Sequence, residues 1–335
     1  MCHWEKGLYT TLRTPVQTDG QLISAIFEPK SLHPWGTDMF EGFEKTMIDA
    51  HGCRIHLVHG GSGPALLLLH GYPQTHVEWH KVAPALAEEF TVVCPDLRGY
   101  GDSQKPLSSN GDLSTYCKRT SAHDQVAVME HLGFERFHLV GHDRGVRVGL
   151  RLALDHPGKV MSFTNLDVMP SLEAFENMDE SLAFSWFHWH LMRQPSPLPE
   201  TVFSGNPKLF LDFFLDAWTA VPDSFTQEAY DEYLRCFSDP DTVRAMCADY
   251  RAVALDIEHD QADRGTLLDC PVLVLWGAEM SKRPGWQTGK DLDMMTVWRQ
   301  RACDVRGKAI ACGHFIPEEN PDALVSELRA FLKEC

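Results

Sequence analysis

The stretch Phe137–Arg147 constrains the fold of this chain more than any other. An apolar, strand-like run reaches Gly141, two polar residues follow, and Gly145 opens an apolar run of helix length that ends near His156. The pattern predicts a strand, a sharp turn and a helix, with Asp143 at the tip of the turn. A residue at such a tip is held in a strained backbone conformation, and glycines two positions to either side let the strand and the helix approach closely.

This turn resembles the nucleophile elbow of α/β-hydrolases, which usually reads G-x-S-x-G, with an aspartate in place of the serine. A serine needs a base to remove its proton before it attacks an acyl carbon. Asp143 is already an anion at neutral pH, because the reference pKa of aspartate is about 4. A carboxylate is suited to displacing a leaving group from a saturated carbon, and the ester that results must then be cleaved by water. The residue type therefore predicts opening of a carbon–halogen bond or an epoxide rather than ester hydrolysis.

Composition sets the class of protein and excludes several partners. The chain has 335 residues, enough for one large α/β domain with an insertion or for two average domains, and 44% of its residues are hydrophobic. The net charge of −17 argues against nucleic acids and anionic membranes as partners. The N-terminus lacks the apolar segment of a signal peptide, and no apolar run reaches the ~18 residues of a membrane span. We therefore expect a small-molecule substrate as the partner, and a homodimer is compatible with the sequence.

Cysteine and histidine spacing indicates no metal and no cofactor. The ten cysteines show no CxxC spacing, and Cys94, Cys270 and Cys312 lie in or beside apolar runs. We expect buried thiols in a cytoplasmic protein rather than a disulfide framework. His188 and His190 have no third ligand at a zinc-like spacing.

The pattern as a whole predicts an α/β-hydrolase fold: a mostly parallel central sheet flanked by helices, with an inserted α-helical lid. Strands are expected at 46–50, 54–59, 65–69, 90–94, 136–140, 160–166, 271–276 and 308–311, and helices near 77–87, at 118–131, after the elbow and at 321–332.

The alternation of strands and helices stops at residues 168–269, where aromatic residues recur at helical spacing, and we interpret this segment as the lid. Residues 41–167 and 270–335 then form the core domain, and residues 1–40 form an N-terminal extension without assigned chemistry.

The second half of a covalent mechanism needs a base. His314 follows the last predicted strand, where an α/β-hydrolase fold places its histidine, and the order Asp143, acid, His314 fits that fold. Two acids remain open: Asp167 ends the strand after the elbow helix, and Glu279 follows the next strand. We favour Asp167, because its shorter side chain is fixed close to a strand end.

Arg144 and Arg147 are three positions apart and therefore share one face of the elbow helix. Two cations in the first turn oppose the helix dipole, and the rest of the helix is too apolar to leave them a solvated face. Their guanidinium groups are well shaped to hold a substrate carboxylate. The loop after the strand at 65–69 contains Tyr72, and we expect the backbone N–H groups of Tyr72 and Arg144 to form an oxyanion hole.

Three lid residues are candidate donors to a leaving group: His188, Trp189 and Tyr250. An imidazole N–H, an indole N–H and a phenol O–H can share the charge that a departing halide concentrates on one atom. The alternative interpretation is that these side chains only fill a core.

Four motifs together resemble the fluoroacetate (haloacetate) dehalogenases, over residues 40–334. They are the run His70–His76, the loop Asp96–Ser103, the elbow Gly141–Arg147 and the pair His188-Trp189.

The resemblance implies that Asp143 attacks the α-carbon of the substrate and that Arg144 and Arg147 bind its carboxylate. It also implies that His188, Trp189 and Tyr250 hold the halide, that His314 activates water for ester hydrolysis, and that Asp167 is the acid. The product would be a 2-hydroxy acid.

An epoxide hydrolase is the alternative function. It would share the aspartate and the histidine but protonate the epoxide oxygen with two lid tyrosines, and Tyr230 and Tyr233 lack the context that Tyr250 has. A neutral epoxide would also leave Arg144 and Arg147 unpaired. A third interpretation is a non-catalytic ligand receptor on the same fold.

Overall fold

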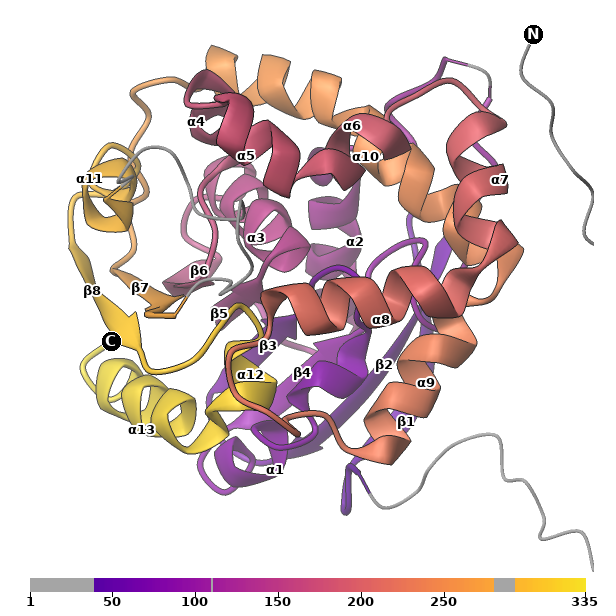
Figure 1. Ribbon diagram of the computed structural model, residues 1–335. Helices are drawn as coiled ribbons and strands as arrows, with labels where there is room; N and C mark the ends of the chain where they lie inside the picture. The colour runs from indigo at the N-terminus through magenta and orange to yellow at the C-terminus, as the bar shows by residue number, and fades with distance from the viewer. Residues whose placement is uncertain (1–38, 110, 280–292) are drawn as a thin grey trace, which may run out of the picture. The chain divides into compact units, whose positions relative to one another are not determined.

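The computed structural model describes residues 39–109, 111–279 and 293–335 (Figure 1). The predicted N-terminal extension therefore lies almost wholly outside the described residues. The described residues contain an eight-stranded sheet in the order β1-β2-β4-β3-β5-β6-β7-β8.

The sheet is mostly parallel, as the sequence predicts. Strand β2 pairs antiparallel with both β1 and β4, and every other neighbouring pair is parallel. The strands are β1 (Glu44–Ala50), β2 (Cys53–Gly61), β3 (Ala65–Leu69), β4 (Thr91–Pro95), β5 (Phe137–His142), β6 (Val160–Leu166), β7 (Val272–Gly277) and β8 (Val305–Ile310). Strands β3 and β5 are buried along their whole length, because helices cover both faces of the sheet.

Most predicted strand boundaries lie within two residues of the observed ones, and two differences are larger. Strand β8 begins at Val305 and not at Lys308, because its pairing with β7 extends over residues whose side chains are largely exposed and therefore show no apolar pattern. The single helix expected near 77–87 is a 3-10 turn, η1 (His76–Trp79), followed by a short helix, α1 (Ala83–Leu86). Pro84 explains the break, since proline is tolerated in the first turn of a helix but not in its interior.

Helices flank the sheet in two groups on opposite sides (Figure 1). Helices α2 (Lys118–His131) and α3 (Arg144–Asp155) pack together, and α3 also packs on β3, β5 and β6. On the other side, α1 packs against α13 (Pro321–Leu332), which follows α12 (Ile316–Glu319). Helix α11 (Met294–Trp298) contacts β7 and β8.

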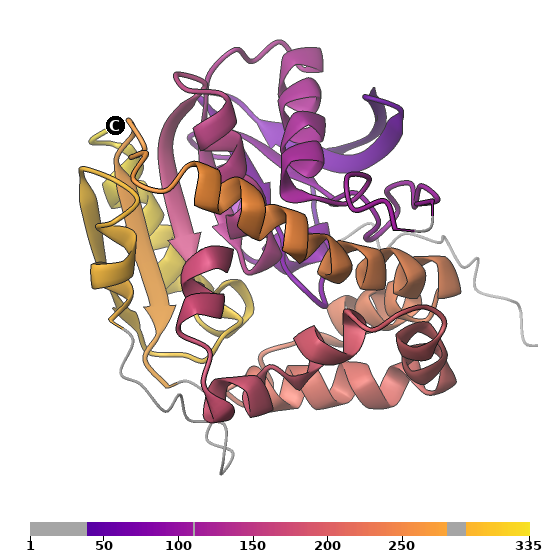
Figure 2. The ribbon, with the colours of Figure 1, turned by 90° about the horizontal axis from the view of Figure 1, so that it is seen from above.

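The chain between β6 and β7 is helical, as expected for the lid. Its helices are α4 (Ser171–Glu176), α5 (Glu180–Ser185), α6 (Phe187–Met192), α7 (Leu198–Gly205), α8 (Pro207–Trp218), α9 (Gln227–Phe237) and α10 (Pro240–Ala262). Figure 2 shows these helices toward the side to which the arrowheads of β6 and β7 point. They therefore adjoin the carboxyl ends of the parallel strands, where open α/β sheets bind their ligands.

The elbow depends on close packing of β5 and α3 against the end of β3. A Cβ atom on Gly145 would lie 2.1 Å from the carbonyl oxygen of Leu69, and one on Gly141 would lie 2.6 Å from the backbone nitrogen of Val146. Between the two glycines, Asp143 adopts φ 43° and ψ −108°, a conformation that residues with side chains rarely adopt. The buried strands on either side hold this strained turn in place.

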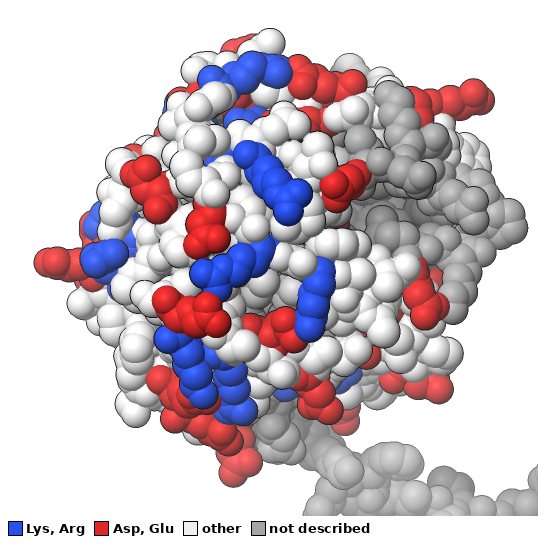
Figure 3. Space-filling model, turned by 90° about the vertical axis from the view of Figure 1, so that its left-hand side faces the viewer, with Lys and Arg blue, Asp and Glu red and all other residues white. Residues whose placement is uncertain are grey.

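The surface mixes both signs of charge. On the face shown in Figure 3, basic and acidic side chains lie interspersed. None of the helices in the described part of the chain combines the length and the apolar character needed to cross a membrane. Cysteines of the described residues carry free thiols, and Cys94 and Cys312 are buried while Cys270 is half-buried.

The packing at the elbow predicts a large cost for one added methyl group. Gly145→Ala should lower the free energy of unfolding by at least about 2 kcal/mol, because the new Cβ meets backbone atoms that cannot move aside. Gly205→Ala, at the end of α7 with no atom within 4 Å of the added Cβ, is the matched control and should change stability by less than about 0.5 kcal/mol. Urea denaturation measures both, and equal stabilities would contradict the packing argument.

Candidate active site

Asp143 lies at the N-terminus of α3 with its carboxylate held by two donors. The backbone N–H of Tyr72 donates to Oδ1 at 2.9 Å, and Arg147 Nη1 lies 3.3 Å from Oδ2. Tyr72, one of the two predicted oxyanion donors, therefore contacts the Asp143 carboxylate through its backbone N–H. The oxyanion role of the Tyr72 and Arg144 N–H groups stays a prediction.

The charge of Asp143 is set by its neighbours. Burial would raise the pKa of this carboxyl, but the nearby positive charges, first that of Arg147 and then that of Arg144, hold it well below its usual range. Asp143 is therefore an anion at neutral pH, as a nucleophilic carboxylate must be.

His314 and Asp167 lie together beyond the ends of β8 and β6. Asp167 Oδ2 is 2.7 Å from His314 Nδ1, and its Oδ1 accepts a hydrogen bond from the backbone N–H of Gly277 at 2.8 Å. An ionised carboxylate can only accept, so Nδ1 carries the proton and Nε2 is left as a basic nitrogen. Of the two acids that the sequence left open, Asp167 is the one hydrogen-bonded to His314, whereas Glu279 is exposed at the end of β7.

The two predicted carboxylate-binding arginines are both buried. Arg144 donates from Nε to Asp249 Oδ2 at 2.8 Å and from Nη2 to the backbone oxygen of Asp249 at 3.2 Å. Tyr100 and Lys118 also donate to Asp249, so the position of Arg144 is fixed from α10. Arg144 Nη1 and Arg147 Nε are buried and have no hydrogen-bond partner among the described residues. Each arginine therefore keeps donor capacity that these residues do not use.

The three predicted leaving-group donors meet above these arginines. His188 and Trp189 lie on α6 and Tyr250 on α10, with ring centroids 5.2 Å apart for Trp189 and Tyr250 and 5.6 Å apart for His188 and Tyr250. The Arg144 guanidinium lies 4.3 Å from the ring centroid of Tyr250, and that of Arg147 lies 4.7 Å from Trp189.

Burial keeps two of these donors neutral. It lowers the pKa of His188 to about 3 and raises the pKa of Tyr250 well above its usual range, the latter against the opposing charge of Arg144. An imidazole N–H and a phenol O–H are therefore both present at neutral pH, and each can donate to an anion.

Sequence reasoning missed Asp249 and the buried pair Glu78 and His142. Asp249 directly precedes Tyr250, and His142 directly precedes Asp143, so both lie beside residues singled out by the sequence. Glu78 belongs to a segment that the sequence indicated only as packing, and no pattern distinguishes it. It lies behind the elbow, where Oε2 is 3.2 Å from His142 Nδ1.

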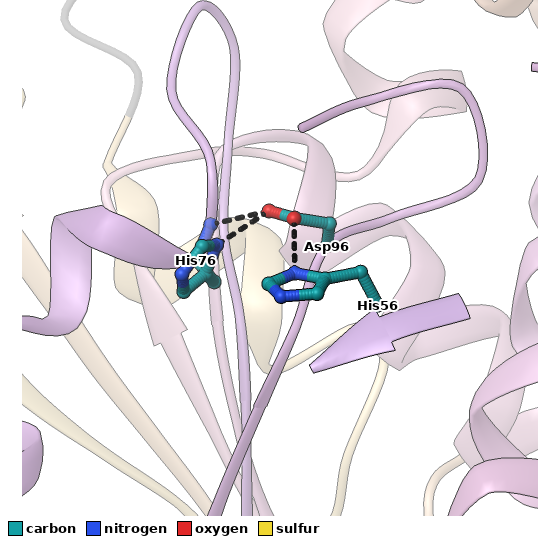
Figure 4. Close-up of side chains that lie close together, drawn as sticks. All are labelled: His56, His76 and Asp96. Atoms are coloured by element: carbon teal, nitrogen blue, oxygen red, sulfur yellow. Dashed lines mark hydrogen bonds and ion pairs between the residues drawn. The ribbon is translucent and has the colours of Figure 1, made fainter. Parts of the chain in front are cut away.

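A second cluster of titratable side chains stands away from this site. Figure 4 shows the Asp96 carboxylate between two imidazoles, with His56 Nδ1 2.8 Å from Oδ2 and His76 Nδ1 2.9 Å from Oδ1. The backbone N–H groups of His76 and Asp102 donate to the same carboxylate at 2.8 and 3.0 Å. These contacts occupy both oxygens and join β2, η1 and the loop after β4, so the cluster links these three segments.

Comparisons with known proteins give the same picture of the fold. The family model for the α/β hydrolase fold matches residues 64–321. A fluoroacetate dehalogenase from Burkholderia sp is 44% identical over 299 residues, which cover 89% of this chain and 96% of that protein. A soluble epoxide hydrolase from Corynebacterium sp. (strain C12) is 33% identical over 285 residues, covering 84% and 94%. The crystal structure of a protein from Nostoc sp PCC 7120 has a TM-score of 0.84 at 47% identity, covering 88% of this chain and 99% of that one.

Proposed function

The chain belongs to the α/β-hydrolase family, and we propose that it is a hydrolytic dehalogenase that cleaves the carbon–halogen bond of a haloacetate through a covalent ester on Asp143. One observation carries this proposal. Two buried arginines, Arg144 and Arg147, lie beside an anionic carboxylate and keep N–H groups that no described residue satisfies. The similarity to a fluoroacetate dehalogenase supports it.

In the first step, one oxygen of Asp143 attacks the α-carbon of the haloacetate. The bond from carbon to oxygen forms as the carbon–halogen bond breaks, and the halide leaves with the bonding electron pair. Oδ2 is the attacking oxygen, because the Tyr72 N–H binds Oδ1 at 2.9 Å, whereas the contact of Arg147 Nη1 with Oδ2 is longer, at 3.3 Å. The free N–H groups of Arg144 and Arg147 bind the substrate carboxylate and so direct its α-carbon toward Asp143.

Leaving-group stabilisation comes from the lid. His188, Trp189 and Tyr250 donate to the departing halide, whose charge is concentrated on one atom and gains most from several donors in a site with little water. Fluoride, the smallest halide, needs this assistance most.

In the second step, water cleaves the ester. His314 Nε2 takes a proton from water, and the hydroxide attacks the carbonyl carbon of the ester. Negative charge develops on Oδ1, where the Tyr72 N–H already lies at 2.9 Å. The acyl–oxygen bond then breaks, and the oxygen of the 2-hydroxy acid takes the proton from His314. The Asp143 carboxyl, which now contains the hydroxyl group of the water, releases its remaining proton to solvent and becomes a carboxylate again. Asp167 stabilises the protonated imidazole between these events.

The alternative, epoxide hydrolysis, is supported by the similarity to a soluble epoxide hydrolase. That chemistry needs a pair of lid tyrosines to protonate the epoxide oxygen. Two of the lid tyrosines are engaged elsewhere: the Tyr233 hydroxyl donates to Glu318 at 2.6 Å, and the Tyr230 hydroxyl donates to Asp212 at 2.5 Å. Tyr250 is then the only one of these three tyrosines left to protonate an epoxide oxygen, and the reaction needs two. We therefore favour halide displacement.

A substrate panel separates these functions. The purified protein should release halide from fluoroacetate and chloroacetate and form no diol from styrene oxide. Ion chromatography measures the halide and chromatography of the organic products measures the diol. Diol formation without halide release would assign the chain to the epoxide hydrolases, and neither product would favour the receptor interpretation.

His314→Asn should stop the reaction after the first step. Multiple turnover should fall by about 1,000-fold, because the base that activates water is lost, while Asp143 can still displace the halide. We expect about one halide per protein molecule and a mass increase of one carboxymethyl group on the peptide that contains Asp143, measured by mass spectrometry. Asp143→Asn is the control and should give neither product. Continued turnover by His314→Asn would show that another group is the base.

Arg147→Gln should discriminate substrates by charge. We expect the ratio of kcat/KM for chloroacetate to that for chloroacetamide to fall by about 100-fold, because the variant loses a charged hydrogen bond to the carboxylate. Removing the contact between Arg147 and Asp143 should lower kcat/KM equally for both substrates. The ratio of the two kcat/KM values therefore isolates carboxylate binding. Arg151→Gln, one turn along α3, is the control and should leave this ratio unchanged. An unchanged ratio for Arg147→Gln would make this arginine structural.

A further inference from the structure

Behind the elbow lies a pair of side chains that the proposed mechanism does not use. Glu78 on η1 and His142, the last residue of β5, both have 0% exposed surface. Glu78 Oε2 lies 3.2 Å from His142 Nδ1 and also accepts a hydrogen bond from the backbone N–H of Gly71 at 3.2 Å. On the other side of the ring, His142 Nε2 is 2.9 Å from the backbone oxygen of His314.

The two partners of His142 determine where its protons are. The His314 carbonyl oxygen can only accept, so Nε2 carries a hydrogen. The Glu78 carboxylate also accepts, so Nδ1 carries one as well and the ring is an imidazolium. Burial would lower the pKa of His142, but Glu78 raises it to about 9, with smaller contributions from Asp143 and Asp167. An ionised, fully buried pair joined to the backbone at both ends is costly to disrupt.

This pair connects the segments that carry out ester hydrolysis. Gly71 directly precedes Tyr72, whose N–H contacts Asp143 Oδ1. The rings of His142 and His314 have centroids 4.6 Å apart. One chain of hydrogen bonds therefore runs from the oxyanion loop through Glu78 and His142 to the residue proposed as the base.

We propose that Glu78 and His142 form a buried ion pair that positions His314 and the Tyr72 N–H for hydrolysis of the ester, and that they act as positioning residues without touching substrate. This inference rests on the proposed function. It assigns the pair mainly to the second step, because His314 acts only there and because the Tyr72 N–H is needed most when negative charge develops on Oδ1. Loss of the pair should slow ester hydrolysis more than ester formation.

Steady-state kinetics separate this role from simple packing. With chloroacetate, kcat/KM reports the steps up to halide release, and kcat includes ester hydrolysis. His142→Leu should lower kcat by at least about 30-fold, change kcat/KM by less than about 3-fold, and leave most of the enzyme as the ester during turnover, as seen by intact-protein mass spectrometry. His142→Gln keeps one N–H donor for the His314 carbonyl and should restore part of kcat.

The matched control is His138→Leu. His138 is buried on the same strand, but its Nδ1 faces Ser162 at 2.8 Å, away from the elbow. The His138→Leu variant should have a lower free energy of unfolding but should not accumulate the Asp143 ester during turnover. An equal loss in kcat and kcat/KM for His142→Leu, or ester accumulation in His138→Leu as well, would overturn the positioning role.

A measurement on the wild-type protein tests the ion pair itself without any substrate. In ¹⁵N NMR spectra at pH 7.5, both ring nitrogens of His142 should carry hydrogens, and Glu78→Gln should remove one of them. The signal is assigned by its absence from His142→Gln or, if that variant does not fold, by its contact with the His314 ring. A neutral His142 ring in the wild-type protein would overturn the inference. Failure to release halide would instead refute the proposed function, and the NMR result would still decide whether the ion pair exists.

Discussion

The half-buried carboxylate of Asp143 next to the guanidinium group of Arg147 is the interaction on which the other parts of the site depend. A carboxylate at this depth would take up a proton unless cations compensated its burial, and Arg147 and Arg144 supply that compensation. Arg144 is in turn neutralised by Asp249, which also binds Lys118. Opposite charges thus alternate from the elbow to α10, so the lid and the sheet are joined by electrostatics as well as by apolar packing.

The elbow could be predicted from the sequence because all of its determinants are local. Two glycines, a polar tip and a change from strand to helix patterning fall within a few residues, and each glycine proves to be required by close backbone contacts. Long-range partners are a different matter. Arg144 and Asp249 are 105 positions apart, and the sequence assigned Arg144 wholly to substrate although part of its donor capacity is bound by Asp249. The burial of Glu78 could not be predicted from the sequence either, because an acidic residue in a helical pattern normally faces solvent.

The similarity to epoxide hydrolases follows from the different roles of the sheet domain and the lid. The elbow, the histidine and its acid serve any reaction that passes through an aspartyl ester. What differs is the group that must be stabilised as it leaves, and its donors all come from the helices between β6 and β7. In this chain the donors that we propose are an imidazole, an indole and a single phenol around two arginines, while the Tyr233 hydroxyl donates to Glu318.

Tyr72 belongs to both halves of this arrangement. Its backbone N–H donates to the Asp143 carboxylate, and its ring stacks on His188 with centroids 5.6 Å apart and an interplanar angle of 8°. A substitution at position 72 would therefore act on two contacts at once. A smaller side chain in place of this aromatic ring would loosen both His188 in the lid and the loop whose N–H contacts Asp143, so the size of this one ring links the order of the lid to that of the elbow.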